Sequence, residues 1–85
     1  MKNLVYACHN ADVVIGEIVH ENPQGACAVL THWGTYINFL CRKDVKELTE
    51  TVYNNLNDYH KKVVDNWDHD KMIERAKKSG THILK

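Results

Sequence analysis

The sequence predicts a single α+β domain, in which an antiparallel meander of three to four strands precedes a long amphipathic helix packed on one sheet face and a short C-terminal helix. Runs rich in β-branched and aromatic residues fill positions 4–41. After position 44 the apolar residues recur at spacings of three and four, which is the helical period. A chain of 85 residues is also too short for a second independent core. We therefore expect a sheet part at 1–41, a helical part at 44–79 and a tail at 80–85.

Four short segments carry the strand pattern, at 4–8, 13–20, 26–33 and 35–41. Residues 10–12 make the first connection. The next, Asn-Pro-Gln-Gly at 22–25, matches a type I turn position by position, because the fixed φ of proline fits its second place and glycine suits its last. A hairpin is expected there.

Gly34 leaves two alternatives for the last part of the sheet. With Thr35 it makes a two-residue turn that places Trp33 opposite Tyr36, or it marks a bulge in one long strand. A second glycine, Gly16, lies inside a predicted strand, where it marks a bend or bulge rather than a ligand contact.

The long helix is expected from position 45 to about position 67. Asp44 precedes it as an N-cap, and Glu47 completes a capping-box pattern. Such a helix measures about 35 Å, whereas a globule of this size is about 30 Å across, so the excess of its apolar stripe is expected to meet the second helix, the tail or another chain. The residues of the stripe are Val45, Leu48, Val52, Leu56, Tyr59, Val63 and Trp67.

The stretch VVDNWDHDKM, at 63–72, is predicted to be the corner between the two helices. The apolar residues beyond Trp67 are out of phase with the stripe, so the helix breaks or kinks there. Asp68 or Asp70 then caps a second helix through about Lys78, and Gly80 ends it. Residues 81–85 are expected to form a short strand or a docked tail.

Composition and charge restrict the function class. The net charge is zero, and no apolar run approaches the ~18 residues that cross a bilayer. The N-terminus does not resemble a signal peptide, so the expected compartment is the cytoplasm, without a membrane partner. No phosphate loop, nucleophile elbow or dinucleotide fingerprint is present, so we expect a non-enzymatic protein without a cofactor.

Metal binding is an alternative with two sets of donors. Asp65 and His69 are four residues apart and would face one ligand together on a helix, but two ligands do not make a site. Adjacent Cys8 and His9 point to opposite faces of a strand. We prefer reduced, buried cysteines and no metal site, because the donors of the sheet part lack the close pairing of zinc ligands. Those donors are Cys8, His9, His20, Cys27, His32 and Cys41.

Nucleic-acid binding is a less favoured alternative. Its support is a C-terminal basic group made of Arg75, Lys77, Lys78, His82 and Lys85. Exposed sheet aromatics would also be needed, and alternation separates Tyr36 from Phe39 on opposite faces. The aromatic residues considered are Tyr6, Trp33, Tyr36 and Phe39.

The favoured function is binding to another protein, with a homodimer as one form of that contact. Tyrosine and tryptophan are expected to contribute because large amphipathic rings serve both cores and interfaces. An inhibitor from a virus or mobile element that occludes a host enzyme or defence complex is one such module, although no particular residue indicates this subtype. The expected partner-binding residues are Tyr53, Tyr59, Trp67, Asp65, Asp68 and Asp70.

Overall fold

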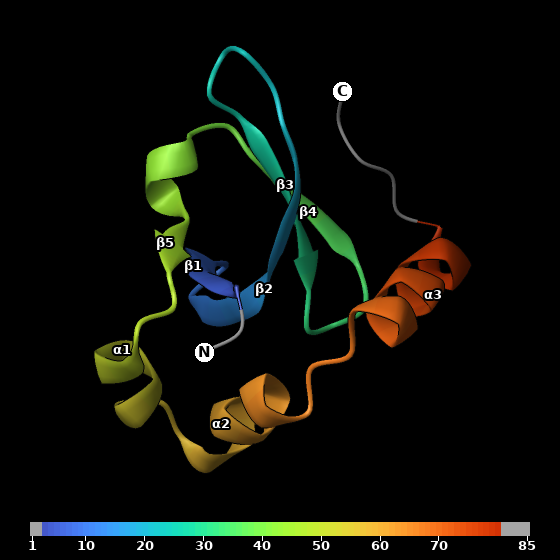
Figure 1. Ribbon diagram of the computed structural model, residues 1–85. Coiled ribbons are helices and arrows are strands. Elements are labelled where there is room, and N and C mark those ends of the chain that lie inside the picture. Colours follow the sequence, from blue (N-terminus) through green and yellow to red (C-terminus); the bar gives the residue numbers. More distant parts are fainter. Residues whose placement is uncertain (1–2, 81–85) are drawn as a thin grey trace.

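The computed structural model describes residues 3–80, which form a five-stranded antiparallel sheet followed by three helices (Figure 1). The strand order is β4-β3-β2-β1-β5. The predicted α+β class, with the sheet before the helices, is confirmed, and β5 is a strand that the sequence analysis missed. The elements are β1 (Val5–His9), β2 (Asp12–Glu21), β3 (Cys27–Thr31), β4 (Tyr36–Phe39), the short 3-10 helix η1 (Arg42–Asp44), β5 (Lys46–Glu47), α1 (Glu50–Asn54), α2 (Asp58–Asp65) and α3 (His69–Ser79).

The first two hairpin turns fall where turn chemistry predicts them. Asn10 and Ala11 connect β1 to β2 with φ values of 52° and 67°, the left-handed geometry of a two-residue hairpin turn. In the 22–25 turn, the Gly25 N–H donates to the Asn22 carbonyl at 3.1 Å. The Asn22 side chain also accepts from the Ala26 N–H, at 2.9 Å, and so the side chain and backbone of one residue organise the turn.

Gly34 belongs to a turn and not to a bulge, but the turn is longer than the two residues predicted. The Thr31 N–H donates to the Thr35 carbonyl, and Tyr36 pairs with Leu30, so the predicted pairing of Trp33 with Tyr36 is wrong. The bulge lies in β2, between Ile18 and His20.

Gly16 has a different role from the predicted bend. A Cβ there would lie 2.0 Å from the Leu30 carbonyl oxygen. Glycine is therefore required because the backbones of β2 and β3 approach closely.

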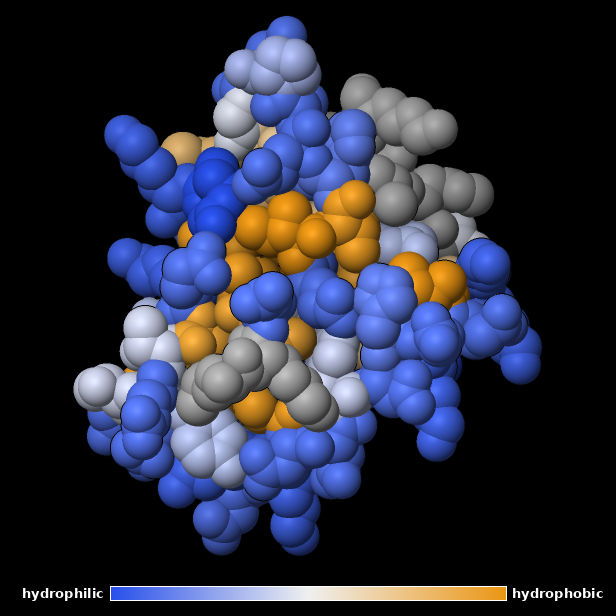
Figure 2. Space-filling model, in the orientation of Figure 1, coloured by the Kyte–Doolittle hydropathy of each residue, from blue (hydrophilic) through white to orange (hydrophobic). Residues whose placement is uncertain are grey.

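Both faces of the sheet are covered. The helices pack on the face that carries Leu4, Ile15 and Leu30. The opposite face carries Val5, Val29 and Phe39, and Val45 from the connection between η1 and β5 packs on it. Figure 2 shows hydrophobic side chains gathered between β5 and β4 within a ring of hydrophilic ones. The expected single helical cover thus accounts for only one of two cores.

The predicted helix over 45–67 is wrong. Thr49 and Asn57 cap α1 and α2, each accepting a hydrogen bond from the backbone N–H three residues later. Asp44 and Glu47 lie in η1 and β5, so they form no capping box. The apolar spacing persists across the break because both helices pack apolar residues against one cluster that contains Leu4 and Ile15. The excess apolar surface that was inferred from one continuous helix is therefore absent from the described residues.

The predicted second helix is present as α3. Of the two candidate caps, Asp68 is the residue whose side chain accepts from the Lys71 N–H, at 3.2 Å. Gly80 ends the helix in the left-handed conformation, with φ of 77°, as expected. The predictions for 81–85, including His82 and Lys85, lie outside the described residues. Within residues 3–80, no helix has the length and apolar character needed to span a membrane.

Candidate binding site

Several of the predicted partner-binding residues make contacts within the chain. The Tyr53 hydroxyl donates to Asp65 Oδ1 at 2.8 Å, and this contact raises the pKa of the Tyr53 phenol. The Trp67 ring packs in both hydrophobic clusters on the helical face. Asp68 caps α3, whereas Asp70 is exposed in its first turn. Of the aromatic residues predicted to bind a partner, only Tyr59 has most of its surface exposed, at 60%.

Glu17 is a structural residue that the sequence analysis missed. It accepts hydrogen bonds from the Trp67 indole N–H and from His69 Nδ1, at 3.0 Å for the latter, and joins the α2–α3 corner to the middle of β2. Its partners lie 50 and 52 residues away in the sequence. This Glu17 contact and the separation of Asp65 and His69 into different helices contradict the less favoured alternative in which those two residues face one ligand on a single helix.

The donors of the sheet part remain dispersed. Within residues 3–80, no three His, Cys, Asp or Glu side chains form a group that could hold a metal ion. Cys27 is buried, and burial raises the pKa of its thiol, but Cys8 and Cys41 are exposed, which contradicts the expectation of buried cysteines.

The C-terminal basic group is divided by the structure. Arg75 packs against Gly34, and its guanidinium lies 3.4 Å from the Trp33 carbonyl oxygen. Lys77 and Lys78 are exposed in the last turn of α3. The described part of the group therefore contains three exposed basic residues, of which Arg75 also packs against Gly34.

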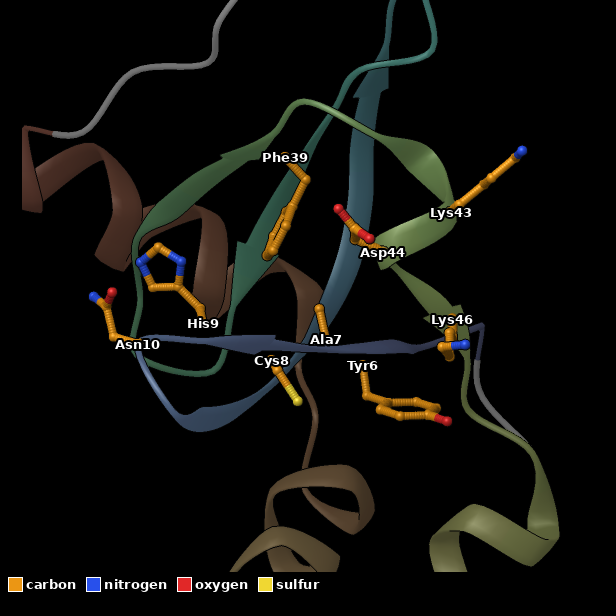
Figure 3. Close-up of a pocket in the computed structure, with 9 residues that line it drawn as sticks. All are labelled: Tyr6, Ala7, Cys8, His9, Asn10, Phe39, Lys43, Asp44 and Lys46. Carbon is orange, nitrogen blue, oxygen red and sulfur yellow. The ribbon is translucent and has the colours of Figure 1, made fainter.

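One hollow lies beside the part of β1 that β5 does not pair. It has a volume of about 450 Å³. Figure 3 shows Ala7, His9 and Phe39 on one side of β1, whereas Tyr6 and Cys8 point to the other side, as predicted for Cys8 and His9. Its charged lining residues, Lys43, Asp44 and Lys46, are of both signs, so no ligand class is favoured.

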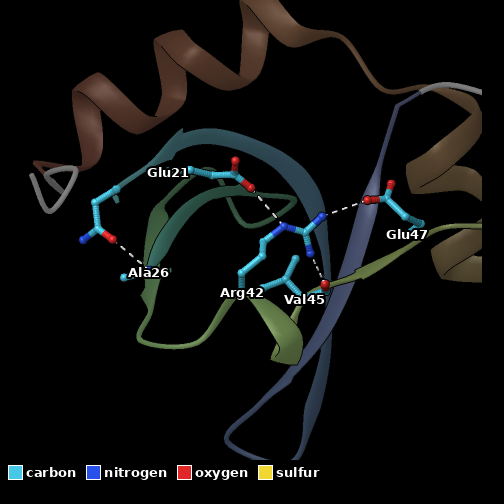
Figure 4. Close-up of polar contacts among 6 residues, drawn as sticks. Glu21, Ala26, Arg42, Val45 and Glu47 are labelled. Carbon is cyan, nitrogen blue, oxygen red and sulfur yellow. Dashed lines mark hydrogen bonds and ion pairs between the residues drawn. The ribbon is translucent and has the colours of Figure 1, made fainter. Parts of the chain in front are cut away.

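Arg42 fixes the connection that borders this hollow. Its guanidinium donates to Glu21 at 3.0 Å, to Glu47 at 2.8 Å and to the Val45 carbonyl (Figure 4). The backbone N–H of Arg42 also donates to the Gly25 carbonyl at 2.7 Å. These contacts are structural, because they satisfy the guanidinium within the chain.

A second hollow joins exposed aromatic residues from two parts of the chain. It has a volume of about 260 Å³ and lies between the β3–β4 turn, the start of β2 and the start of α2. Tyr59 contributes a ring that is 60% exposed, and Trp33 one that is 39% exposed. We call this the aromatic hollow; its lining residues are Asp12, Val13, His32, Trp33, Tyr59 and His60.

The rings of the aromatic hollow lie close together around His32. The centroid of His32 is 5.0 Å from that of Trp33, 6.1 Å from Tyr59 and 5.6 Å from His60. These four rings come from two segments that are far apart in the sequence, 32–33 and 59–60, so their proximity depends on the complete fold. The sequence indicated Tyr59 but gave no signal that Trp33 and the two histidines would accompany it.

His32 is held in position by an arrangement that extends the β2–β3 ladder. Its backbone N–H donates to the Ile15 carbonyl at 2.8 Å, and its Nδ1 accepts from the Ile15 N–H at 3.1 Å. An unprotonated Nδ1 accepts this bond, and Nδ1 also lies 3.3 Å from the Ile15 carbonyl oxygen, to which a protonated Nδ1 would donate. Burial lowers the pKa of His32, and the nearby His60 and Arg75 lower it further. The backbone hydrogen bond with Ile15 raises the pKa but does not offset these effects. The ring is therefore neutral at pH 7.

Comparison with known proteins supplies no family: no family model, no curated protein and no solved structure matches this chain. The assignment of function therefore depends on the geometry of the chain itself.

Proposed function

We propose that this chain is a small non-enzymatic module that binds another protein at the aromatic hollow. The observation that carries the proposal is the exposure of Trp33 and Tyr59 on the lining of one hollow. Rings of this kind are enriched among the residues that dominate binding energy at protein interfaces, and they contribute most when a partner removes them from water. The sole other large hydrophobic residue exposed within 3–80 is Leu40.

The surroundings of the two rings support this use. His32 is 7% exposed and anchored to β2, so the floor of the hollow is held rigidly beneath the exposed rings. A prearranged surface loses less conformational entropy on binding than a mobile one. An inhibitor that occludes a host enzyme or defence complex would act through such a surface, and identification of the partner would test that narrower proposal.

Affinity purification followed by mass spectrometry tests the proposal. The wild-type chain would be compared with Trp33→Ala, Tyr59→Ala and the control Leu40→Ala, which removes another exposed hydrophobic side chain, outside the hollow. Each ring deletion is expected to weaken capture of a reproducible partner about thirtyfold, as for a contact of about 2 kcal/mol. Leu40→Ala should capture it normally.

Circular dichroism and thermal unfolding would establish that each variant is folded before capture is compared. Equal capture by all variants, or recovery of no reproducible partner, would contradict the proposal. Co-purification of nucleic acid that is lost when Lys77 and Lys78 are replaced would favour nucleic-acid binding instead.

A further inference from the structure

The walls of the aromatic hollow are set at steep angles to one another. The rings of His32 and His60 meet at 87°, those of His32 and Tyr59 at 66°, and those of Tyr59 and His60 at 64°. Stacked rings cover one another's faces, whereas in an edge contact only one ring of the pair has a face covered by its partner. The face of an aromatic ring is negative, and several faces around one space attract a cation.

The charge of the lining has the sign that a cation requires. Asp12 lines the aromatic hollow, and no lysine or arginine is among the described residues that do so. Arg75 lines a neighbouring hollow with Met72 and Trp67, and it lies close enough to His32 to lower the pKa of that ring. His32 adds no positive charge at pH 7, because its Nδ1 accepts the Ile15 N–H.

The size of the hollow suits one chemical group and not a whole cofactor. Its volume of about 260 Å³ lies below the roughly 300–1,000 Å³ of pockets that enclose drug-sized ligands. A single side chain that ends in a charged group fits this scale. Aromatic walls with a nearby carboxylate are the arrangement that recognises alkylated ammonium groups.

We infer that the aromatic hollow receives an alkylammonium group, namely a lysine side chain of the partner in its free or methylated form. The inference rests on the proposed function, since it names the part of the partner that occupies the hollow. Trp33 and Tyr59 provide ring faces, Asp12 provides the opposing charge, and His32 fixes the floor.

Titration with tetramethylammonium chloride, followed by the amide and indole NMR signals of ¹⁵N-labelled protein, tests the inference. Saturable shifts are expected at Trp33, Tyr59 and His60. Neopentyl alcohol, a neutral compound of similar shape, and sodium chloride at equal ionic strength should give none. A comparable saturable response to the neutral compound, or no saturable response to tetramethylammonium, would overturn the inference.

Matched variants separate ring faces and charge from simple apolar contact. Tyr59→Leu keeps apolar volume but removes a ring face, and Asp12→Asn removes the carboxylate charge. Each is expected to weaken tetramethylammonium binding about twofold to fivefold, the range of one exposed cation–π contact. Tyr53→Leu, whose ring contacts Asp65 outside the hollow, is the control and should bind normally. Unchanged binding in both Tyr59→Leu and Asp12→Asn would contradict the assignment of these residues.

The two proposals fail in different ways. Loss of partner capture by Trp33→Ala without any tetramethylammonium response would retain the protein-binding function and overturn the cation site. Tetramethylammonium binding without any effect of Trp33→Ala or Tyr59→Ala on partner capture would retain the cation site and overturn the proposed function.

Discussion

His32 is the residue in which fold and candidate site meet. β3 ends at Thr31, and the backbone and imidazole of the next residue together satisfy both polar groups of Ile15. A buried N–H without a partner costs about 1–3 kcal/mol, so the imidazole stabilises the end of the ladder. The same ring forms part of the aromatic hollow, and any change in its charge is therefore expected to affect both stability and binding.

Acid is expected to destabilise the protein through His32. Its folded-state pKa is lowered from the ordinary value of 6.5, so the unfolded chain takes up this proton first as the pH falls. The contribution of His32 is thus retained above pH 6.5 and lost progressively below it. Urea unfolding at pH 7.5 and 5.0 should show a larger loss of free energy in the wild type than in His32→Leu.

His32→Leu should also be less stable at both pH values, because it leaves the Ile15 N–H unpaired at a cost of about 1–3 kcal/mol. His20→Leu, which alters a histidine outside the aromatic hollow, is the control for a general effect of losing an imidazole. An equal loss of free energy on acidification in His32→Leu and the wild type would show that His32 does not carry the pH dependence.

At the scale of elements, local chemistry predicted the turns and the start of α3, whereas the division of the helices depended on the tertiary structure. The 22–25 turn and the Asp68 cap each use a side chain to bind nearby backbone, so a few residues determine them. The spacing from 45 to 67 is the same for one long helix or for separate pieces packed on one sheet. The period alone therefore reveals neither loop 55–57 nor the two-residue strand β5.

The candidate site was predictable only in part for a related reason. Tyr59 was identified because a large ring in an amphipathic pattern serves interfaces as well as cores. Trp33 and Asp12 come from two hairpins of the sheet, and nothing in their local sequence indicates that α2 lies beside them. Only the packing of α2 on the start of β2 brings these residues together.

Two aspartates near the start of α3 provide a matched test of capping. Asp68→Ala is expected to lower the free energy of unfolding by about 1 kcal/mol, because its side chain accepts the Lys71 N–H. Asp70→Ala should cost less, since Asp70 contributes through the positive end of the helix, at about 0.3–1 kcal/mol. Urea denaturation followed by circular dichroism measures both. A larger effect of Asp70→Ala would reverse the assignment of the cap.

At the scale of the whole molecule, one connection gives the sheet its second core. Residues 40–45 run from β4, at one edge of the sheet, to β5, at the other edge, and Val45 packs beside Val5 and Phe39 on the way. Strand β5 pairs with β1 through only two residues, too few to hold a strand by themselves. Arg42 provides the missing restraint, because it binds Glu21 at the end of β2 and Glu47 in β5.

Removal of this guanidinium is expected to loosen β5 while the helices remain protected. Arg42→Met keeps the apolar stem and removes both ion pairs, which are partly exposed, so the expected cost is about 1 kcal/mol. Hydrogen exchange should accelerate about fivefold at the Leu48 N–H, which donates to the Leu4 carbonyl beside β5, and little at the Met72 N–H in α3.

Lys43→Met, which removes a neighbouring positive charge in η1, is the control. The difference between Arg42→Met and the wild type should also shrink in 1 M salt, because salt screens partly exposed charges. Equal acceleration at both amides would mean that Arg42 stabilises the fold as a whole and that β5 is held by Val45 packing alone.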